Sequence, residues 1–209
     1  LNIFDISNPS NPQPMSSLSV TADIGTFAGH PNQRPSIYVS GKRAYITDGS
    51  ISSVFTVVDV SNPTSPSVLS SMLIGVNLTD VFVSGRYAYI TSWNDTAANE
   101  NFFILDISTS TPSIIAKINS IGGATDGGPF SVYVQGRYAY VANEYSDSLS
   151  IIDVSNPAAP VVKQNVALST GGTDINPVAV SVNGRYAYVA NNQSANGNGE
   201  ASAAGVNGE

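Results

Sequence analysis

Apolar and polar positions alternate along short segments of the chain, and one such segment occurs four times. Each copy consists of a short apolar run, a glycine, and a second run that begins with a basic residue and carries tyrosine. Two alternating runs on either side of a glycine turn predict a β-hairpin. At Asn183-Gly184 we expect a type I′ turn, because both central residues of that turn need positive φ. The four copies occupy residues 36–47, 80–91, 131–142 and 179–190.

A second alternating segment follows three of these hairpins, and its strand ends at an aspartate. A turn that contains proline comes next and breaks the strand. After it comes a more irregular apolar run, which is typical of an outer edge strand. A fourth copy of the second segment does not follow residue 190 and occurs at the N-terminus instead. The copies are residues 1–9, 55–63, 102–108 and 149–157, and the irregular runs are 68–74, 114–118 and 161–168.

The two segments together repeat along the chain at the period of a β-propeller. The turn glycines at 41, 85, 136 and 184 are 44, 51 and 48 residues apart. Self-similarity at that spacing marks propellers or solenoids. Each unit provides four short strands, and no window shows helical periodicity. We therefore expect an all-β fold, a β-propeller of four-stranded antiparallel blades, with four blades in this chain.

The repeat also resembles a known family. Residues 138–143 read Tyr-Ala-Tyr-Val-Ala-Asn, and residues 149–157 read Leu-Ser-Ile-Ile-Asp-Val-Ser-Asn-Pro. On these segments the chain resembles the LVIVD-repeat family of bacterial and archaeal β-propellers, over residues 1–20 and about 36–190. The resemblance implies a secreted or cell-surface protein of a prokaryote and says little about function. Residues 108–112 depart from the pattern because they lack Asn-Pro, which leaves the geometry of that turn open.

The position of the fourth half-repeat predicts how the ring closes. If the N-terminal segment supplies the third and fourth strands of the blade begun at 178–190, the two ends form a latch that removes exposed strand edges. Two alternatives stay open: the blades are a piece of a larger ring, or two copies of the chain share one ring. Residues 192–209 contain almost no large apolar side chain, so we expect a flexible tail there. The expected propeller domain is 1–191, with blades at about 36–74, 80–118, 130–168, and 178–190 plus 1–20.

Composition excludes several classes of function. The 209 residues include 8 Lys+Arg and 15 Asp+Glu, for a net charge of -7, which disfavours nucleic acid or an anionic membrane as partner. The absence of cysteine excludes disulfides, cysteine-bound zinc and thiol catalysis, and one histidine excludes a multi-histidine metal site within one copy. No apolar run approaches the roughly 20 residues that span a bilayer, so we expect no transmembrane segment.

Each repeat pairs a basic residue with an aspartate. The basic residue follows the turn glycine and the aspartate ends the third strand, so hairpin register places the two opposite each other. We expect a structural role for these acids, which can also accept backbone N–H bonds from the Ser-Asn turn that follows. The basic residues are Lys42, Arg86, Arg137 and Arg185, and the aspartates are Asp59, Asp106, Asp153 and Asp5.

The remaining acids gather at one end of the strands. In an up-and-down blade, the loop between the second and third strands lies at the same end as the connection between blades. A surface of one charge sign attracts cations or basic partners; the alternative is that these acids keep a lysine-poor protein soluble. Carboxylate and amide oxygens in 93–101 make Ca²⁺ a candidate ligand, although their spacing is not that of a known calcium loop. The candidate ligand-binding residues are Asp48, Asp80, Trp93, Asp95, Glu100, Asp126, Asn143, Glu144, Asp147 and Asp174.

Trp93 is the only tryptophan and lies in the longest of these loops. Exposed there, it could stack on a sugar or anchor a protein partner; buried, it would only fix the loop. We expect Tyr145, in the matching loop of the third blade, to flank the same surface.

The sequence favours binding over catalysis. His30 is the only candidate base for a nucleophile, and neither a Gly-x-Ser-x-Gly elbow nor a phosphate-binding loop occurs. No catalytic residue is assigned. We expect a secreted or surface-displayed module that binds a protein or glycan ligand through its acidic loops. The alternatives are a hydrolase or lyase that uses carboxylates or a metal at the propeller mouth, and a purely structural blade set of a larger surface protein. The oligomeric state is left open.

Overall fold

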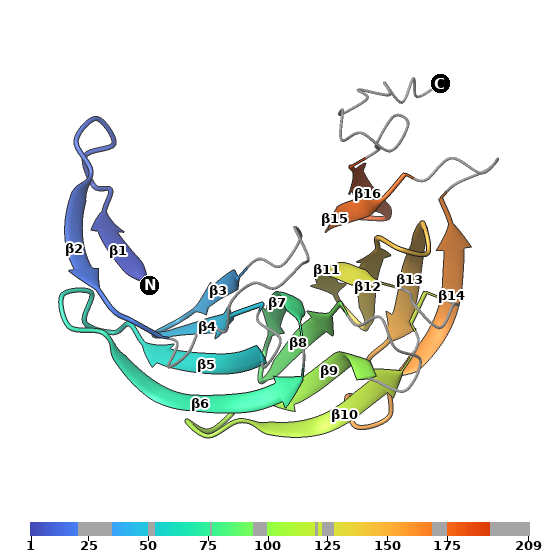
Figure 1. Ribbon diagram of the computed structural model, residues 1–209, viewed down its shortest axis with the longest axis horizontal. Coiled ribbons are helices and arrows are strands. Elements are labelled where there is room, and N and C mark those ends of the chain that lie inside the picture. The colour runs from blue at the N-terminus through green and yellow to red at the C-terminus, as the bar shows by residue number, and fades with distance from the viewer. Residues whose placement is uncertain are drawn as a thin grey trace.

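The chain folds into a row of twisted antiparallel sheets that follow one another along an open arc (Figure 1). The computed structural model describes residues 1–20, 35–49, 53–75, 77–93, 100–119, 121–122, 128–168 and 175–192. Every regular element among these residues is a β-strand, and none is a helix that could cross a bilayer. The all-β fold predicted from the alternating pattern is therefore confirmed.

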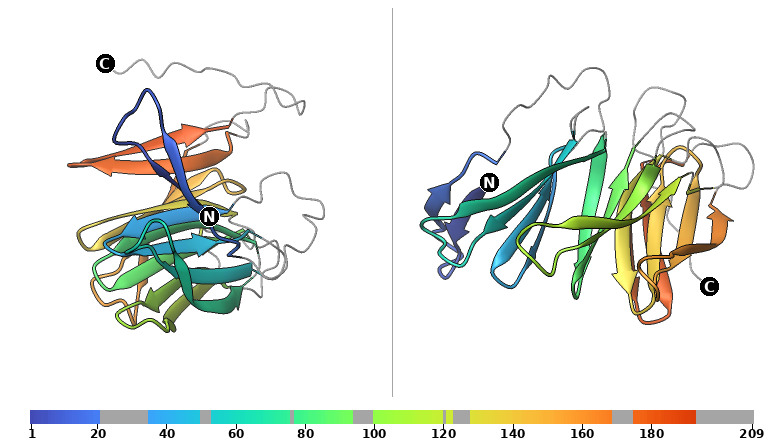
Figure 2. Two further views of the ribbon diagram at one scale, coloured as in Figure 1. Left: turned by 90° about the vertical axis from the view of Figure 1, so that its left-hand side faces the viewer. Right: turned by 90° about the horizontal axis from the view of Figure 1, so that it is seen from below.

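Three sheets are complete four-stranded blades, and in each the strands pair in chain order. Figure 2 shows the blades stacked face to face, each with its own twist. The first blade comprises β3 (Ser36–Ser40), β4 (Arg43–Thr47), β5 (Ser53–Asp59) and β6 (Ser67–Gly75). The second comprises β7 (Leu78–Ser84), β8 (Tyr87–Ser92), β9 (Glu100–Asp106) and β10 (Ser113–Asn119). The third comprises β11 (Pro129–Gln135), β12 (Tyr138–Asn143), β13 (Ser148–Asp153) and β14 (Val161–Ala167).

The two ends of the arc are half-blades. β1 (Asn2–Asp5) pairs with β2 (Gln13–Ser17), and β15 (Pro177–Asn183) pairs with β16 (Tyr186–Asn191), in two separate two-stranded sheets. Figure 1 shows the N-terminal hairpin and β15–β16 at the two ends of the arc. The expected latch between these ends is therefore not formed in this structure. The five sheets follow one another and the last does not meet the first. The rotation from one sheet to the next is therefore smaller than the quarter-circle that a closed four-bladed ring requires.

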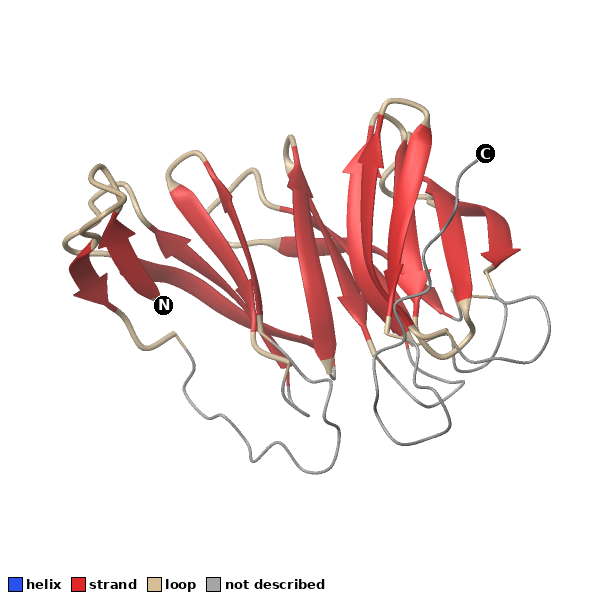
Figure 3. Cartoon of the chain, turned by 90° about the horizontal axis from the view of Figure 1, so that it is seen from above, coloured by secondary structure: helices blue, strands red, loops and turns tan. Residues whose placement is uncertain are grey.

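Local turn geometry fixes the hairpins. The strand pairing of Asn183 with Tyr186 leaves a two-residue loop, Gly184-Arg185, in which Gly184 has a φ of 61°. Asn183 ends the strand and is not among the residues with positive φ. Positive φ at the first loop position is the type II′ pattern, so the expected type I′ turn was wrong. The same glycine turn occurs in each complete blade, and Figure 3 shows the strands running between the two edges of the arc.

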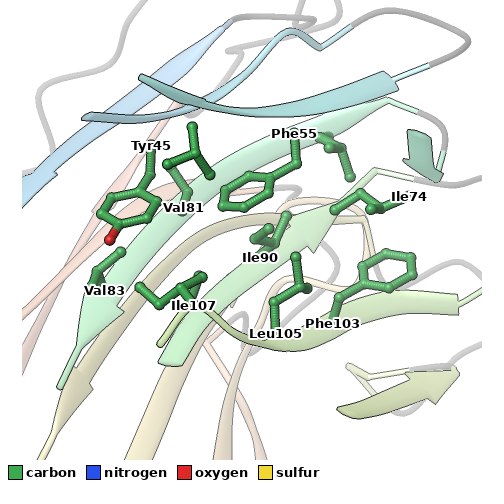
Figure 4. Packing of buried hydrophobic residues seen from close by; sticks show 12 residues of the cluster. Tyr45, Phe55, Ile74, Val81, Val83, Ile90, Phe103, Leu105 and Ile107 are labelled. Atoms are coloured by element: carbon green, nitrogen blue, oxygen red, sulfur yellow. The ribbon is translucent and has the colours of Figure 1, made fainter. Parts of the chain in front are cut away.

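The core lies between blades rather than within one sheet. Between the first and second blades, the Tyr45 ring packs with Val81 and Val83, and Phe55 and Phe103 are buried nearby (Figure 4). A second cluster joins the second blade to the third, and smaller clusters connect the half-blades to their neighbours. Middle strands are therefore apolar on both faces, and each buried Phe or Leu contributes about 1.5–3 kcal/mol. The outermost strands carry bulges and lie at sheet edges, as predicted.

The repeated acids stabilise turns and hairpins. Arg86 forms an ion pair with Asp106, and Arg137 forms one with Asp153, as expected. The expected register is wrong by one residue, because the residue directly opposite each aspartate is the one that follows the predicted basic residue: Tyr87, Tyr138 and, in the first blade, Arg43. Each of the four repeat aspartates also accepts a hydrogen bond from the backbone amide two residues further on. These bonds are Ser7 to Asp5 (2.8 Å), Ser61 to Asp59 (2.8 Å), Ser108 to Asp106 (2.9 Å) and Ser155 to Asp153 (3.0 Å).

Candidate functional site

One end of the arc brings the second-to-third-strand loops onto the connections between blades. The backbone amide of Trp93 donates to the Asn77 carbonyl, and that of Glu144 donates to the Gly128 carbonyl, both at 2.8 Å. Asn77 and Gly128 have left-handed backbones, with φ of 51° and 57°. The prediction that these loops and connections share one end is confirmed for the described residues.

Trp93 and Tyr145 form an aromatic pair at this end. Their ring centroids lie 5.6 Å apart, and the rings are steeply inclined at 62°. Trp93 is half-buried, whereas Tyr145 is 66% exposed. The sequence left open whether Trp93 is exposed or buried, and the structure shows that it is partly buried. Tyr145 is the more exposed ring of the pair. The prediction that the two side chains flank one surface is confirmed.

Gly128 lies directly beneath this pair. A Cβ atom at Gly128 would lie 2.8 Å from the Tyr145 Cβ and 3.1 Å from the Trp93 Nε1. Because its φ is also in the left-handed region, only glycine fits this position without displacement. The close approach holds Trp93 and Tyr145, which belong to different blades, against one another.

Asn143 and Glu144 continue the same segment inward. Both side chains are buried. The Asn143 amide donates to the Ser148 Oγ at 3.1 Å and to the Ser150 Oγ at 2.8 Å. Within the described part of the chain, the Asn143 Oδ1 is buried without a hydrogen-bond partner. Asn143 thus fixes the base of the loop that carries Tyr145, rather than facing solvent.

Asp80 has a different position from the one expected. It was assigned to a connection between blades, but it lies in β7, the innermost strand of the second blade. Its carboxylate accepts hydrogen bonds from Ser36 Oγ at 2.7 Å, Ser131 Oγ at 3.1 Å and the Val132 amide at 3.0 Å. Burial raises the pKa of Asp80, and these hydrogen bonds oppose that rise. Asp80 therefore connects the inner strands of three blades.

Three further candidates also have hydrogen-bond or ion-pair partners. The Asp48 carboxylate accepts from the Val54 amide at 3.0 Å, across the turn from β4 to β5. Asp147 accepts from the amides of Ile175 and Asn176 at 3.1 and 2.9 Å. Glu100, expected in the loop between the second and third strands, is instead the first residue of β9 and forms an ion pair with Lys117 of β10 at 3.2 Å. Each carboxylate thus has partners that account for its position.

The acidic face as a whole remains a prediction. Asp95, Asp126 and Asp174 lie outside the described residues, as does His30. Among the residues that the structure does describe, no three acidic or histidine side chains converge as they would around a metal ion. Of the expected site, the structure thus brings Trp93 together with Tyr145. The described acids Asp48, Asp80, Glu100 and Asp147 each have partners of their own.

The sequence reasoning missed an aromatic row along the inner strands. The rings of Tyr38 and Phe82 lie 5.0 Å apart, and those of Phe82 and Tyr133 lie 4.9 Å apart. These residues occupy the same position in β3, β7 and β11, two residues after the Ser36, Asp80 and Ser131 position. The signal was present, because this position is aromatic in three of the four repeats.

Consecutive four-stranded sheets, packed face to face and joined by short connections, define a repeat protein of the β-propeller class. The chain belongs to the LVIVD repeat family, which matches residues 1–20, 34–73, 77–119, 126–167 and 178–194. No match was found among curated proteins.

Solved structures support the same fold. The periplasmic gluconolactonase PpgL of Pseudomonas aeruginosa aligns with 92% of this chain and 56% of its own, at 18% identity and a TM-score of 0.69. A Bacteroides uniformis protein proposed as a 6-phosphogluconolactonase covers 87% of this chain and 53% of its own, at 13% identity and a TM-score of 0.64. The Cps50 (Swd1) β-propeller domain of Myceliophteria thermophila covers 86% and 56%, at 10% identity and a TM-score of 0.55. This chain thus spans about half the length of these structures, and the likeness concerns fold alone.

Proposed function

We propose that this chain is a non-catalytic binding module whose ligand contacts the Trp93–Tyr145 pair. The observation that carries the proposal is the exposed Tyr145 ring, held against Trp93 by the close approach of Gly128. A large aromatic side chain that is already fixed loses little conformational entropy on binding. The blades then act as a rigid support, and the loops at this end supply recognition.

The chemistry of the pair favours a ligand with an apolar face. Aromatic rings stack on sugar rings and anchor protein side chains, and the polar edge of Tyr145 adds a hydroxyl as donor or acceptor. We propose a glycan as the first ligand class to test and a protein as the second. Membership in the LVIVD repeat family and the fold likeness to a periplasmic gluconolactonase support an exported location. We propose that the chain acts at the cell surface or outside the cell.

A glycan array, followed by titration of each positive glycan, tests this proposal. We expect Tyr145→Ala and Trp93→Ala to weaken binding at least tenfold, since each removes an aromatic anchor. Leu73→Ala is the matched control, because Leu73 is also 66% exposed but lies on the outer strand β6. Binding that survives both aromatic substitutions would overturn the assignment of this surface.

The alternatives have separate readouts. A hydrolase at the propeller mouth predicts turnover of sugar lactones, the substrate class in the names of two of the similar structures. A calcium site predicts an increase in melting temperature with Ca²⁺ that a chelator reverses, by the linkage RT ln(1 + [L]/Kd). A purely structural role predicts neither turnover nor binding.

A further inference from the structure

The turn between β12 and β13 carries an exposed aromatic ring and a carboxylate. Asn143 pairs with Ser148, so residues 144–147 form this turn. Tyr145 is 66% exposed, and Asp147, two residues further on, is partly exposed. Because two residues span at most about 7 Å of chain, a ligand that covers the Tyr145 ring lies within reach of the Asp147 side chain.

One oxygen of the Asp147 carboxylate fixes the side chain. Its Oδ1 accepts hydrogen bonds from the backbone amides of Ile175 and Asn176, at 3.1 and 2.9 Å. The Asp147 carbonyl accepts from the Leu168 amide at 2.8 Å. Backbone and side chain are therefore both held before a ligand binds, and a group that is already fixed loses little conformational entropy on binding.

The other oxygen of this carboxylate, Oδ2, is available to a ligand. Among the described residues, no hydrogen-bond donor and no lysine or arginine contacts Oδ2, and the atom is not buried. Asp80 differs, because both of its oxygens accept hydrogen bonds. Glu100 differs as well, because Lys117 offsets its charge. Asp147 thus presents a charged acceptor two residues from an exposed ring.

The ring and the carboxylate together select among sugars. An ionised carboxylate only accepts hydrogen bonds, so its ligand must supply a donor. A sugar offers an apolar face of C–H groups to an aromatic ring and hydroxyl donors around its rim. A sugar that carries a carboxylate or a sulfate brings a second negative charge close to Asp147, which costs affinity.

We propose that Asp147 sets the specificity of the Trp93–Tyr145 site: its Oδ2 accepts a hydrogen bond from a hydroxyl of a neutral sugar whose ring lies on Tyr145. This contact rests on the proposed binding function and narrows its ligand class to neutral glycans. The bonds from Ile175 and Asn176 to Oδ1 keep Oδ2 in one orientation, so the acceptor is in place when the sugar arrives.

Asp147→Asn separates a ligand contact from a purely structural role. Asp147 has a φ of 47°, which asparagine tolerates, and the asparagine oxygen can accept from Ile175 and Asn176 as Oδ1 does. The amide nitrogen then replaces Oδ2, so a donor stands where the acceptor was. We expect circular dichroism and Trp93 emission to stay unchanged and sugar binding to weaken about tenfold, because a charge-assisted hydrogen bond is lost. Asp59→Asn is the matched control, since the Oδ1 of Asp59 also accepts from a backbone amide but lies at the opposite edge of the arc.

The measurement is a glycan array of matched oligosaccharides, each present in its neutral form and in a sulfated or uronic-acid form. We expect the unchanged chain to bind neutral members and to bind their anionic forms about tenfold more weakly. Deoxy analogues of the strongest neutral glycan locate the contact. Removal of the hydroxyl that contacts Asp147 should weaken binding by the unchanged chain and leave binding by Asp147→Asn as it was.

Binding to neutral sugars that falls in Asp147→Asn and not in Asp59→Asn supports the inference. Equal binding of neutral and anionic forms, or full binding by Asp147→Asn, overturns it even where binding still depends on Tyr145. An array without a bound glycan, as a protein ligand would give, also overturns this inference alone. Binding that survives both Tyr145→Ala and Trp93→Ala overturns the proposed function as well.

Discussion

The Asp80 carboxylate accepts a hydrogen bond from the Val132 backbone amide, 3.0 Å away, across the boundary between the second and third blades. The same carboxylate accepts from the Ser36 hydroxyl of the first blade at 2.7 Å. The equivalent position is Ser36, Ser131 and Ala179 in the other repeats. One aspartate among short side chains thus ties together the inner strands of three blades.

Replacing Asp80 should loosen these boundaries. Asp80→Ala leaves the partly buried Val132 amide without its acceptor, so we expect a loss of about 1–3 kcal/mol in the free energy of unfolding. Ser36→Ala removes one hydrogen-bond donor but leaves the Asp80 carboxylate its other partners. The loss in the free energy of unfolding should therefore be smaller than in Asp80→Ala. Urea unfolding of both variants measures the difference. Equal losses in the two variants would show that Asp80 has no such role.

Acid should weaken the protein through the Arg86–Asp106 pair. The Arg86 guanidinium, with Ser108, lowers the pKa of Asp106 from 3.8 to about 2. Because the folded pKa lies below the unfolded one, the pair stabilises the fold above about pH 4, and this contribution is lost as the pH falls toward 2. We expect the stability difference between the unchanged chain and Arg86→Gln to shrink over that interval. A difference that stays constant from pH 5 to pH 2 would contradict the assignment.

Gly128 and Gly41 offer a matched pair of substitutions. Both have a φ near 60°, so alanine carries the cost of a left-handed backbone at either position, about 1 kcal/mol. At Gly41 nothing lies within 4 Å of the added Cβ, whereas at Gly128 the Tyr145 backbone nitrogen would lie 2.9 Å away. Gly128→Ala should therefore lose more stability than Gly41→Ala and should also shift the emission of Trp93. Equal losses with unchanged fluorescence would mean that Gly128 does not hold the aromatic pair.

The blades could be predicted from sequence because each hairpin is determined by residues that lie close together in the chain. Alternation, glycine turns and terminal aspartates specify each hairpin, and they bring Arg137 close enough to pair with Asp153 although Tyr138 is the residue directly opposite. Closure could not be predicted in this way. The angle between sheets depends on how side chains such as Tyr45 and Phe55 fill the space between blades, and the alternating pattern marks such positions only as buried.

The candidate site was predictable only in part. Trp93 and Tyr145 stand out as aromatic residues in equivalent loops, and they do meet. Asp80 was misplaced because the recognisable motif begins there, whereas pairing of Leu78 with Ser92 extends the strand two residues earlier, past a register shift. The sequence around a carboxylate in a loop can look the same as the sequence around a carboxylate that bridges strands. Only the burial of the side chain and its hydrogen-bond partners distinguish the two.

The open arc within one chain is the claim on which this account of the fold depends. The chain contains no cysteine, so Ser10→Cys and Asn183→Cys provide two unique sites for spin labels on turns at the two ends. Dilution with excess unlabelled chain restricts the dipolar distance measurement to labels within one molecule. We expect a distance well beyond roughly 15 Å, the width of a four-stranded blade. A dominant population within that width would show that the two ends of one chain meet in a single blade, and would contradict the open arc.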